Sequence, residues 1–297
     1  MPPEMSPQLA HLLKLLKLDQ LDRDLFLGDP GKGEGRLFGG LVAAQCVTAA
    51  YRTVETGSMH SLHAYFLRPG RHDVPIRYVV YRIRDGKTFT TRDVVAYQAG
   101  EAIFQMSCSF ARPEEGVSNQ AQPMPEAPDP EGLPEWDMVR PDKAMREMMK
   151  RWRRERPIEM RFVGPPEPPE TGQVPPRRLW MKPKGVLPED PAIHAGVIAY
   201  STDMSLMSTA YWSHRIPQTW NQQVTASLDH AVWFHRPPHF DDWLLFTSES
   251  PIAHAARALI HATLHRQDGT HVVSVAQEGL IRRPRPSDPD PGGQASA

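Results

Sequence analysis

The sequence GGLVAAQCVTAAYRTV, residues 39–54, has small and apolar residues at helical spacing, which predicts a buried helix. Its opening pair, Gly39-Gly40, suits a tight entry into that helix. Four β-like runs follow, at residues 61–69, 76–86, 89–100 and 101–113. Asp85-Gly86 and Ala99-Gly100 separate three of these runs and predict hairpin turns. This stretch therefore predicts one helix followed by an antiparallel sheet.

The same order returns later in the chain. Residues 195–216, AGVIAYSTDMSLMSTAYWSHRI, predict a second helix, and four further β-like runs follow it, at residues 230–238, 243–251, 256–269 and 270–284. The segment HAYFLRP at 63–69 also resembles HAVWFHRP at 230–237. One helix and one curled sheet cannot bury their apolar faces alone, whereas two such units can pair edge strands. We therefore predict an α+β duplication with a continuous sheet.

Composition excludes several classes of protein. The 297 residues include 34 Lys and Arg against 35 Asp and Glu, so the net charge is −1, without the basic excess typical of nucleic-acid binding. No apolar run reaches the roughly 18 residues of a membrane span. The N-terminus lacks the basic segment and cleavage site of a signal peptide. Cys46 and Cys108 form no Cys-x-x-Cys pair, so we expect a reducing, cytoplasmic compartment.

Proline marks the domain organisation. Residues 111–190 hold 16 of the 31 prolines, which predicts a connector with local structure, including a short charged helix and a strand. The C-terminal segment is too polar and too rich in Pro and Gly to fold. We predict a first repeat over 1–112, a connector over 113–190, a second repeat over 191–284 and a disordered tail over 285–297.

Several spaced motifs carry a family resemblance. They are LFGG at 37–40, HSLHAYFLRPG at 60–70, an RDG…F…R pattern at 84–92, LDHAVWFHRP at 228–237 and VAQEGLIR at 275–282. In this order they resemble the acyl-CoA thioesterase II (TesB-type) family. The resemblance implies a double hotdog fold and hydrolysis of acyl-CoA to free fatty acid and CoA. It also implies that no metal or organic cofactor takes part, and that the protein is a homo-oligomer, either a dimer or a tetramer.

The resemblance further implies three catalytic residues in the second repeat. The helix aspartate of the family falls on Asp203, the hydroxyl residue on Ser227 and the strand glutamine on Gln277. Family members often have Thr at the hydroxyl position; Ser keeps the donor and the acceptor lone pairs. A carboxylate can accept a proton from water as general base, and the two neutral side chains can orient that water. Backbone N–H groups at the start of a helix, near Gly39-Gly40 or Asp203, can stabilise the oxyanion.

Each residue also has a purely structural interpretation. Asp203 could cap a helix N-terminus, and Ser227 could be an ordinary strand or turn serine. Gln277 stands in an apolar strand, where an amide costs free energy unless it is bonded, so it is a better site candidate than Ser227. His63 and His230 occupy matching places in the two similar segments, which predicts a shared structural role, such as a bond to nearby backbone.

Other patterns offer weaker functional signals. No His-x-x-x-His or His-Glu-x-x-His helix supports a metal site; His261 and His265 are spaced to share one face of a strand. The basic run RWRRER at 151–156 could attract CoA phosphates, but a solvated face of a charged helix is the commoner explanation.

Two other function classes compete with the thioesterase. An acyl-CoA or acyl-carrier-protein binding protein would have a degenerate site, whereas here all three polar residues are present. A hotdog hydratase would usually carry an Asp/His pair on its helix, which this sequence lacks. Gly-x-Ser-x-Gly is also missing, which counts against an α/β-hydrolase.

Overall fold

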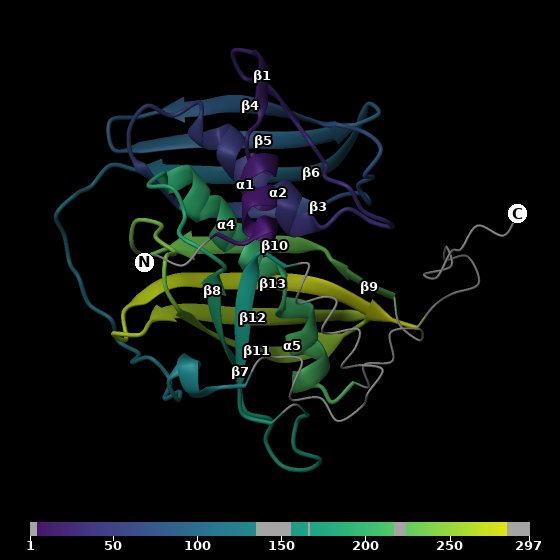
Figure 1. Ribbon diagram of the computed structural model, residues 1–297, viewed down its shortest axis with the longest axis vertical. Helices are drawn as coiled ribbons and strands as arrows, with labels where there is room; N and C mark the ends of the chain where they lie inside the picture. Colours follow the sequence, from purple (N-terminus) through teal and green to yellow (C-terminus); the bar gives the residue numbers. More distant parts are fainter. Residues whose placement is uncertain (1–4, 135–155, 166, 217–223, 284–297) are drawn as a thin grey trace, which may run out of the picture.

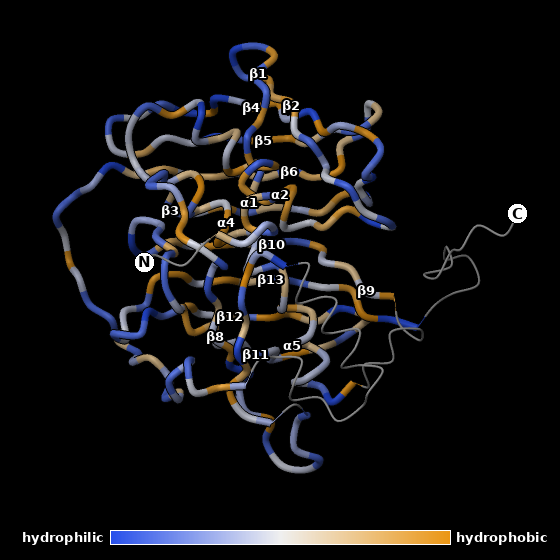
Figure 2. The backbone as a smooth tube through the Cα atoms, in the orientation of Figure 1, coloured by the Kyte–Doolittle hydropathy of each residue, from blue (hydrophilic) through white to orange (hydrophobic). Residues whose placement is uncertain are grey.

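The computed structural model describes residues 5–134, 156–165, 167–216 and 224–283. Most of the predicted charged helix within 113–190 and the predicted tail over 285–297 lie outside these residues. Figure 1 shows two halves stacked one on the other, each with a helix against a curved sheet. Figure 2 shows that the outer loops are mostly hydrophilic, while apolar residues recur along the strands and central helices.

One antiparallel sheet runs through both halves. The first half contributes β1 (Asp19–Asp22), β2 (Leu25–Gly28), β3 (Ser58–Phe66), β4 (Ile76–Asp85), β5 (Phe89–Gln98) and β6 (Glu101–Ala111). The second contributes β7 (Ile158–Val163), β8 (Arg177–Pro183), β9 (Val224–Ser227), β10 (Asp229–Phe234), β11 (Leu244–His254), β12 (Arg257–Arg266) and β13 (His271–Arg282). The strand order is β1-β2-β4-β5-β6-β3-β10-β13-β12-β11-β8-β7, and β9 pairs with β13. From each edge of the sheet to its middle, the strands of the two halves follow the same relative order. This is the predicted α+β double hotdog.

The two halves join where β3 pairs with β10. Ala64 lies opposite His230, and Leu62 lies opposite Val232. Because both strands are interior members of the sheet, neither half exposes an edge at this join. The predicted continuous sheet is confirmed.

Two central helices pack against each other beneath the sheet, α2 (Gly39–Tyr51) and α4 (Pro191–Asp203). Both are buried over most of their surface, as expected for helices that are apolar all round. They run antiparallel and approach closely, since a Cβ on Gly196 would lie 3.3 Å from the carbonyl oxygen of Ala44. The small residues of the predicted helices therefore allow close backbone packing.

The predicted single helix over 195–216 is wrong. α4 ends at Asp203, and a separate helix α5 (Leu206–Ser213) follows. The hydroxyls of Ser201 and Thr202 bond back to the carbonyls of Val197 and Ile198, a pattern that bends helices. The break places Asp203 at a helix end instead of inside a helix.

The predicted connector supplies part of the sheet. β7 and β8 pair with each other, and β8 pairs with β11, so the second half of the sheet starts before residue 191. The N-terminal helix α1 (Pro7–Leu15) and strands β1 and β2 were not predicted; β1 and β2 take the place in the first half that β7 and β8 take in the second. The short helix η1 (Pro130–Gly132) also lies in the connector.

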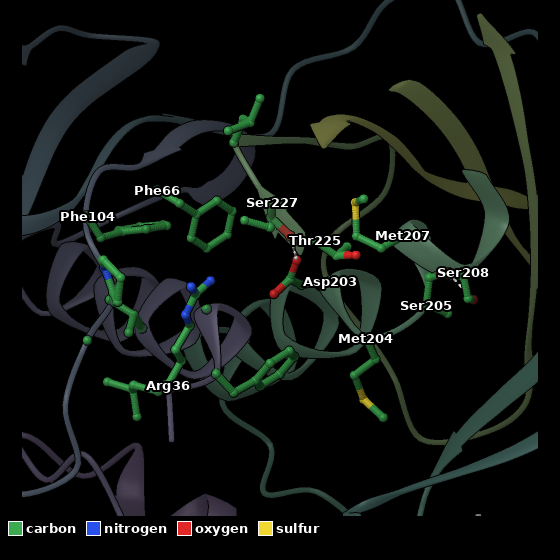
Figure 3. A pocket seen from close by; sticks show the side chains of 18 of the residues that line it. Arg36, Phe66, Phe104, Asp203, Met204, Ser205, Met207, Ser208, Thr225 and Ser227 are labelled. Atoms are coloured by element: carbon green, nitrogen blue, oxygen red, sulfur yellow. Dashed lines mark hydrogen bonds between the residues drawn. The ribbon is translucent and has the colours of Figure 1, made fainter. Parts of the chain in front are cut away.

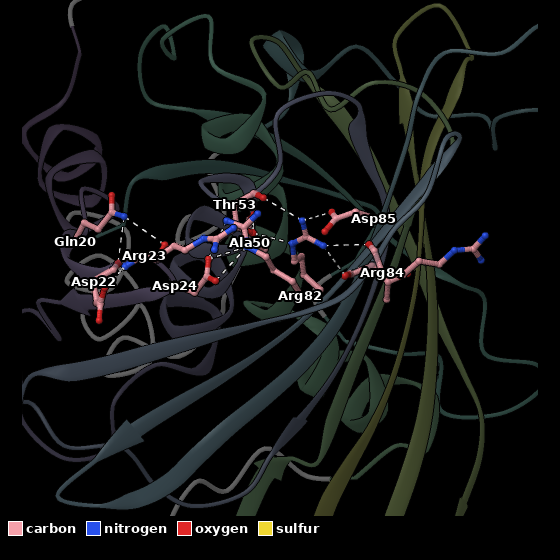
Figure 4. Close-up of polar contacts among 11 residues, drawn as sticks. Gln20, Asp22, Arg23, Asp24, Ala50, Thr53, Arg82, Arg84 and Asp85 are labelled. Carbon is pink, nitrogen blue, oxygen red and sulfur yellow. Dashed lines mark hydrogen bonds and ion pairs between the residues drawn. The ribbon is translucent and has the colours of Figure 1, made fainter.

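Arg92, from the RDG…F…R motif, anchors the end of α2. Its side chain is only 1% exposed, and its guanidinium donates to the hydroxyl and the carbonyl of Thr53 at 3.0 and 3.1 Å. It also pairs with Asp85 and donates to the carbonyl of Arg84 on the β4–β5 hairpin. Figure 4 shows Thr53, Arg84 and Asp85 among these polar contacts. The motif therefore has a structural role in the first half.

Candidate active site

A cavity of about 860 Å³ lies where the start of α2 meets the end of α4. Its wall includes residues from both halves of the chain. Residues that line it include Arg36, Gly39, Val42, Phe66, Arg68, Ile103, Phe104, Arg156, Asp203, Met204, Met207 and Ser227. In Figure 3, Asp203 and Ser227 face each other on one side, with the rings of Phe66 and Phe104 on the other. The cavity is therefore mainly apolar with one polar wall, which suits a ligand with an acyl chain.

Asp203 sits between two helix ends. It is the last residue of α4, and the start of antiparallel α2 lies beside it. The backbone amide of Gly40, at that helix start, acts on its carboxyl and opposes a rise in its pKa. A Cβ on Gly40 would lie 2.8 Å from the carbonyl oxygen of Tyr200, so glycine is needed for this approach. The partial positive charge of the α2 N-terminus favours the carboxylate that the end of α4 disfavours.

Ser227 and Gln277 continue a chain of hydrogen bonds from Asp203. The hydroxyl of Ser227 donates to Asp203 Oδ1 at 3.1 Å, and Gln277 Nε2 donates to Ser227 Oγ at 2.9 Å. Ser227 ends β9, and Gln277 lies on β13 and is fully buried. β9 pairs with β13, which brings the two side chains together. The structure therefore brings together all three predicted site residues.

His230 extends this chain into the protein interior. Its Nδ1 lies 2.7 Å from Gln277 Oε1, and its Nε2 lies 3.0 Å from the hydroxyl of Thr202. Thr202 precedes Asp203 on α4, so the polar chain returns to the helix from which it began. All four side chains of this return path, from Ser227 through Gln277 and His230 to Thr202, are at least partly buried.

Burial controls the charge of this cluster. It raises the pKa of Asp203 above the ordinary carboxyl value, while the nearby His230, the hydrogen bond from Ser227 and the amides of Gly40 and Gln277 oppose the rise. Burial likewise lowers the pKa of His230, and the carboxylate of Asp203 opposes that change. A base with a raised pKa accepts a proton from water more readily than an exposed aspartate does.

The predicted equivalence of His63 and His230 is wrong. His63 is exposed on β3 and packs its ring against Trp233 at 5.1 Å, whereas His230 is fully buried and bonds side chains, not backbone. Leu62 and Ala64 face inward beside it. The local sequence match is out of step by one residue, which moves a strand side chain to the other face.

Sequence reasoning also missed other features of the site. The contact of Gly40 with Asp203 joins the two halves, and no local pattern could reveal it. Arg156 is the one residue of the basic run 151–156 that the structure describes, and it lines the cavity. His261 and His265 do not share a face, since His261 is exposed and His265 is buried beyond an irregularity in the strand pairing.

A group of possible metal ligands lies apart from the cavity. His194, His239 and Asp241 each place one ligand atom within 4.8 Å of the others, but none of them lines the cavity. Nδ1 of His194 already accepts a hydrogen bond from the backbone of Phe240 at 2.9 Å. This histidine therefore has a structural role, tying α4 to the segment before β11.

Comparison with known proteins identifies the family. Residues 153–280 match the acyl-CoA thioesterase family, and residues 29–111 match the acyl-CoA thioesterase N-terminal domain. Acyl-coenzyme A thioesterase 8 of Mus musculus is 37% identical, over 94% of this chain and 92% of that protein. This chain belongs to the acyl-CoA thioesterase family.

Further proteins of similar sequence and fold support this family membership. Acyl-CoA thioesterase 2 of Haemophilus influenzae is 34% identical over 94% of this chain and 99% of its own. The crystal structure of acyl-CoA thioesterase II TesB2 from Mycobacterium marinum matches with a TM-score of 0.76 and 36% identity, over 94% of this chain and all of that one. Among the residues that the structure describes, no helix has the length and apolar character to cross a membrane.

Proposed function

We propose that this acyl-CoA thioesterase hydrolyses its substrate with a water molecule activated by Asp203. The observation that supports this most is the hydrogen-bond chain from Gln277 through Ser227, which ends on a carboxylate in the cavity wall. Asp203 removes a proton from water as the water oxygen bonds to the thioester carbon. The carbon–sulfur bond then breaks, and the proton passes from Asp203 to the departing sulfur, which gives the free acid and CoA.

Ser227 and Gln277 have different parts in this proposal. The Ser227 hydroxyl donates to Asp203 and accepts from Gln277, so one lone pair stays available for the second proton of the water. Gln277 is fully buried and does not line the cavity, so it orients Ser227 and Asp203 instead of touching the water. This assigns Gln277 an indirect role, unlike the direct contact expected from the sequence.

The start of α2 supplies stabilisation for the oxyanion. Gly39 occupies the first position of α2 and lines the cavity, and N–H groups at this position have no partner within their helix. Gly40 acts on the carboxyl of Asp203, so we assign the N–H of Gly39, which lines the cavity, as the donor to the developing negative charge.

The rest of the cavity suits an acyl-CoA. Apolar side chains of Val42, Phe66, Ile103 and Met207 provide a surface for the acyl chain. Arg36 and Arg68 add positive charge to the same cavity, which suits the phosphates of CoA. Figure 3 shows the Arg36 side chain directed into the cavity.

The experiment that tests this function is thiol release from acyl-CoAs of increasing chain length, followed with a colorimetric thiol reagent. We expect turnover with at least one acyl-CoA, unchanged after exhaustive chelation of divalent metals. Tight binding of acyl-CoA without thiol release would favour the alternative, an acyl-CoA or acyl-carrier-protein binding protein. Activity that falls on chelation and returns with zinc would contradict a mechanism that needs no metal.

We also propose that the enzyme is a cytoplasmic homo-oligomer. Tyr65, Tyr81, Ile83 and Phe89 are large apolar side chains exposed on the first half of the sheet, which supports association through that face. Both cysteines are free and buried, as suits a reducing compartment. Light scattering of the purified chain tests the oligomer, and a monomeric mass would contradict it.

A further inference from the structure

The buried histidine His230 has no part in the chemistry proposed above. It is 0% exposed, and it reaches the water-activating side chains only through Gln277. Both of its ring nitrogens nevertheless have side-chain partners, Gln277 on one side and Thr202 on the other. A buried polar group with two defined partners restricts the orientation of both partners.

The chemistry of the partners determines the tautomer of His230. Gln277 Oε1 can only accept a hydrogen bond, so the proton must lie on Nδ1 of His230. Nε2 of the neutral ring then carries a lone pair and takes the hydroxyl proton of Thr202, for which the carbonyls of Ile198 and Ala199, 3.0 and 3.2 Å from the same oxygen, compete. The neutral ring agrees with the lowered pKa that burial gives this histidine.

The opposite tautomer would reverse the amide of Gln277. With the proton on Nε2, the ring would donate to Thr202, and Nδ1 would accept from the amide NH₂ of Gln277. The amide oxygen would then face Ser227 and take its hydroxyl proton, which would withdraw the hydrogen bond from Asp203. The tautomer of His230 and the direction of the Ser227 hydroxyl are therefore coupled through one amide group.

We propose that His230 is a positioning residue that holds the Gln277 amide in the orientation needed by Ser227 and Asp203. This inference rests on the proposed function for its effect on rate. The proton on Nδ1 follows from the Gln277 amide orientation, in which Nε2 donates to Ser227 and Oε1 faces the ring. His230 acts through Gln277 and touches neither water nor substrate.

Substitutions can separate the two ring nitrogens. The side-chain nitrogen of His230→Asn falls near the position of Nδ1, so it can still donate to Gln277. The longer side chain of His230→Gln places its nitrogen near Nε2 and loses that donor. His230→Leu removes both contacts at similar volume. His63→Leu, on the exposed face of β3, is the matched control.

We expect kcat to fall about tenfold in His230→Leu and His230→Gln, the effect of misdirecting one hydrogen bond. KM should change little, because the residue lies outside the cavity wall. His230→Asn should recover most of kcat, and His63→Leu should match the wild type. Equal kcat in the Asn and Gln variants would overturn the proposal, because a merely structural role would not distinguish the two nitrogens.

Nitrogen NMR of the wild-type enzyme gives a second test, which does not depend on whether a variant folds. Protein labelled with ¹⁵N-histidine reports which ring nitrogen carries the proton, and His230 is expected to be neutral with the proton on Nδ1. A proton on Nε2 would overturn the proposal even if the enzyme is active. Failure of thiol release with a proton on Nδ1 would instead contradict the proposed function and leave the positioning geometry standing.

Discussion

The first backbone N–H groups of the two central helices lie in different surroundings. α4 begins after Asp190, whose side chain accepts from the backbone N–H of Ala192 at 2.9 Å. α2 begins after Phe38, which provides no side-chain cap, and the amide of its second residue, Gly40, acts on the carboxyl of Asp203 in the other half and lowers its pKa. One helix start is capped by its own exposed neighbour, and the other lies beside a buried acid from across the molecule.

The last residues of the two helices also differ in their contacts. Both helices have 13 residues; α4 ends in Asp203, and α2 ends in Tyr51. The hydroxyl of Tyr51 accepts from the backbone of Met59, and its ring packs against Phe110. The two related halves therefore differ: the end of α4 carries an acid in the cavity wall, and the end of α2 carries a tyrosine that packs on the sheet. The comparison shows that the first half supports the site through the α2 start, while the second half provides the acid.

Replacement of Asp203 tests this division most severely. Asp203→Asn keeps the shape but cannot accept the proton from water, so we expect kcat to fall by about 10² to 10⁴. Thiol release under saturating acyl-CoA measures the effect. Asp190→Asn is the matched control, because Asn caps helices as well as Asp does. Near-normal kcat in Asp203→Asn would show that the base is assigned wrongly.

The pH dependence separates the two acids further. Because burial raises the pKa of Asp203, kcat/KM should fall with decreasing pH at a midpoint above the ordinary carboxyl value, as the base becomes protonated. The measurement is a pH profile of thiol release with a stable substrate. Asp190→Asn should keep the same profile. A midpoint at or below that of an exposed aspartate would contradict the buried base.

Arg92 tests whether the first half contributes mainly to stability. Arg92→Leu leaves the carbonyls of Thr53 and Arg84 without their buried donor, so we expect a loss of about 3 kcal/mol in the free energy of unfolding. Denaturant unfolding measures this loss, and kcat of the folded protein should stay close to that of the wild type. Arg84→Leu, on the same hairpin but exposed, serves as the control. A larger effect on kcat than on stability would place Arg92 in the site.

Gly40 tests the contact between the halves. A Cβ added there would lie 2.5 Å from the Phe38 ring and 2.8 Å from the carbonyl oxygen of Tyr200, so Gly40→Ala must push the start of α2 away from α4. We expect kcat to fall on the order of tenfold, because the start of α2 then moves away from the carboxylate. Gly116→Ala, whose Cβ meets nothing within 4 Å, should have wild-type kinetics. Unchanged kcat in Gly40→Ala would show that the position of the α2 start does not contribute to catalysis.

Asp190 provides the smallest expected change. Asp190→Ala removes the cap of α4 and should lower the free energy of unfolding by about 1 kcal/mol, with kcat unaffected. Thermal unfolding and thiol release together check this outcome. A marked loss of activity would show that the start of α4 also contributes to catalysis, against this prediction.

The sequence predicted the features that have a local pattern. Turn pairs such as Asp85-Gly86 and Ala99-Gly100 lie between the expected strands, and the family resemblance pointed to Asp203, Ser227 and Gln277, which lie together in the structure. Features that depend on distant contacts were missed. The backbone bonds of Thr202 break the helix, the strand pairing turns His63 outward and His230 inward, and the approach of Gly40 to Asp203 exists only once both halves have folded.

The join between β3 and β10 has a consequence for synthesis on the ribosome. The last strand of the first half, β6, pairs with one edge of β3 and ends at Ala111, but the strand that covers the other edge, β10, does not begin until Asp229. During translation of the intervening residues, the first half can form its own strands and still present the open edge of β3. Contacts between residues so distant in sequence form slowly, and an open edge invites pairing with other chains. Nascent chains of this enzyme should therefore be most prone to aggregate before β10 leaves the ribosome.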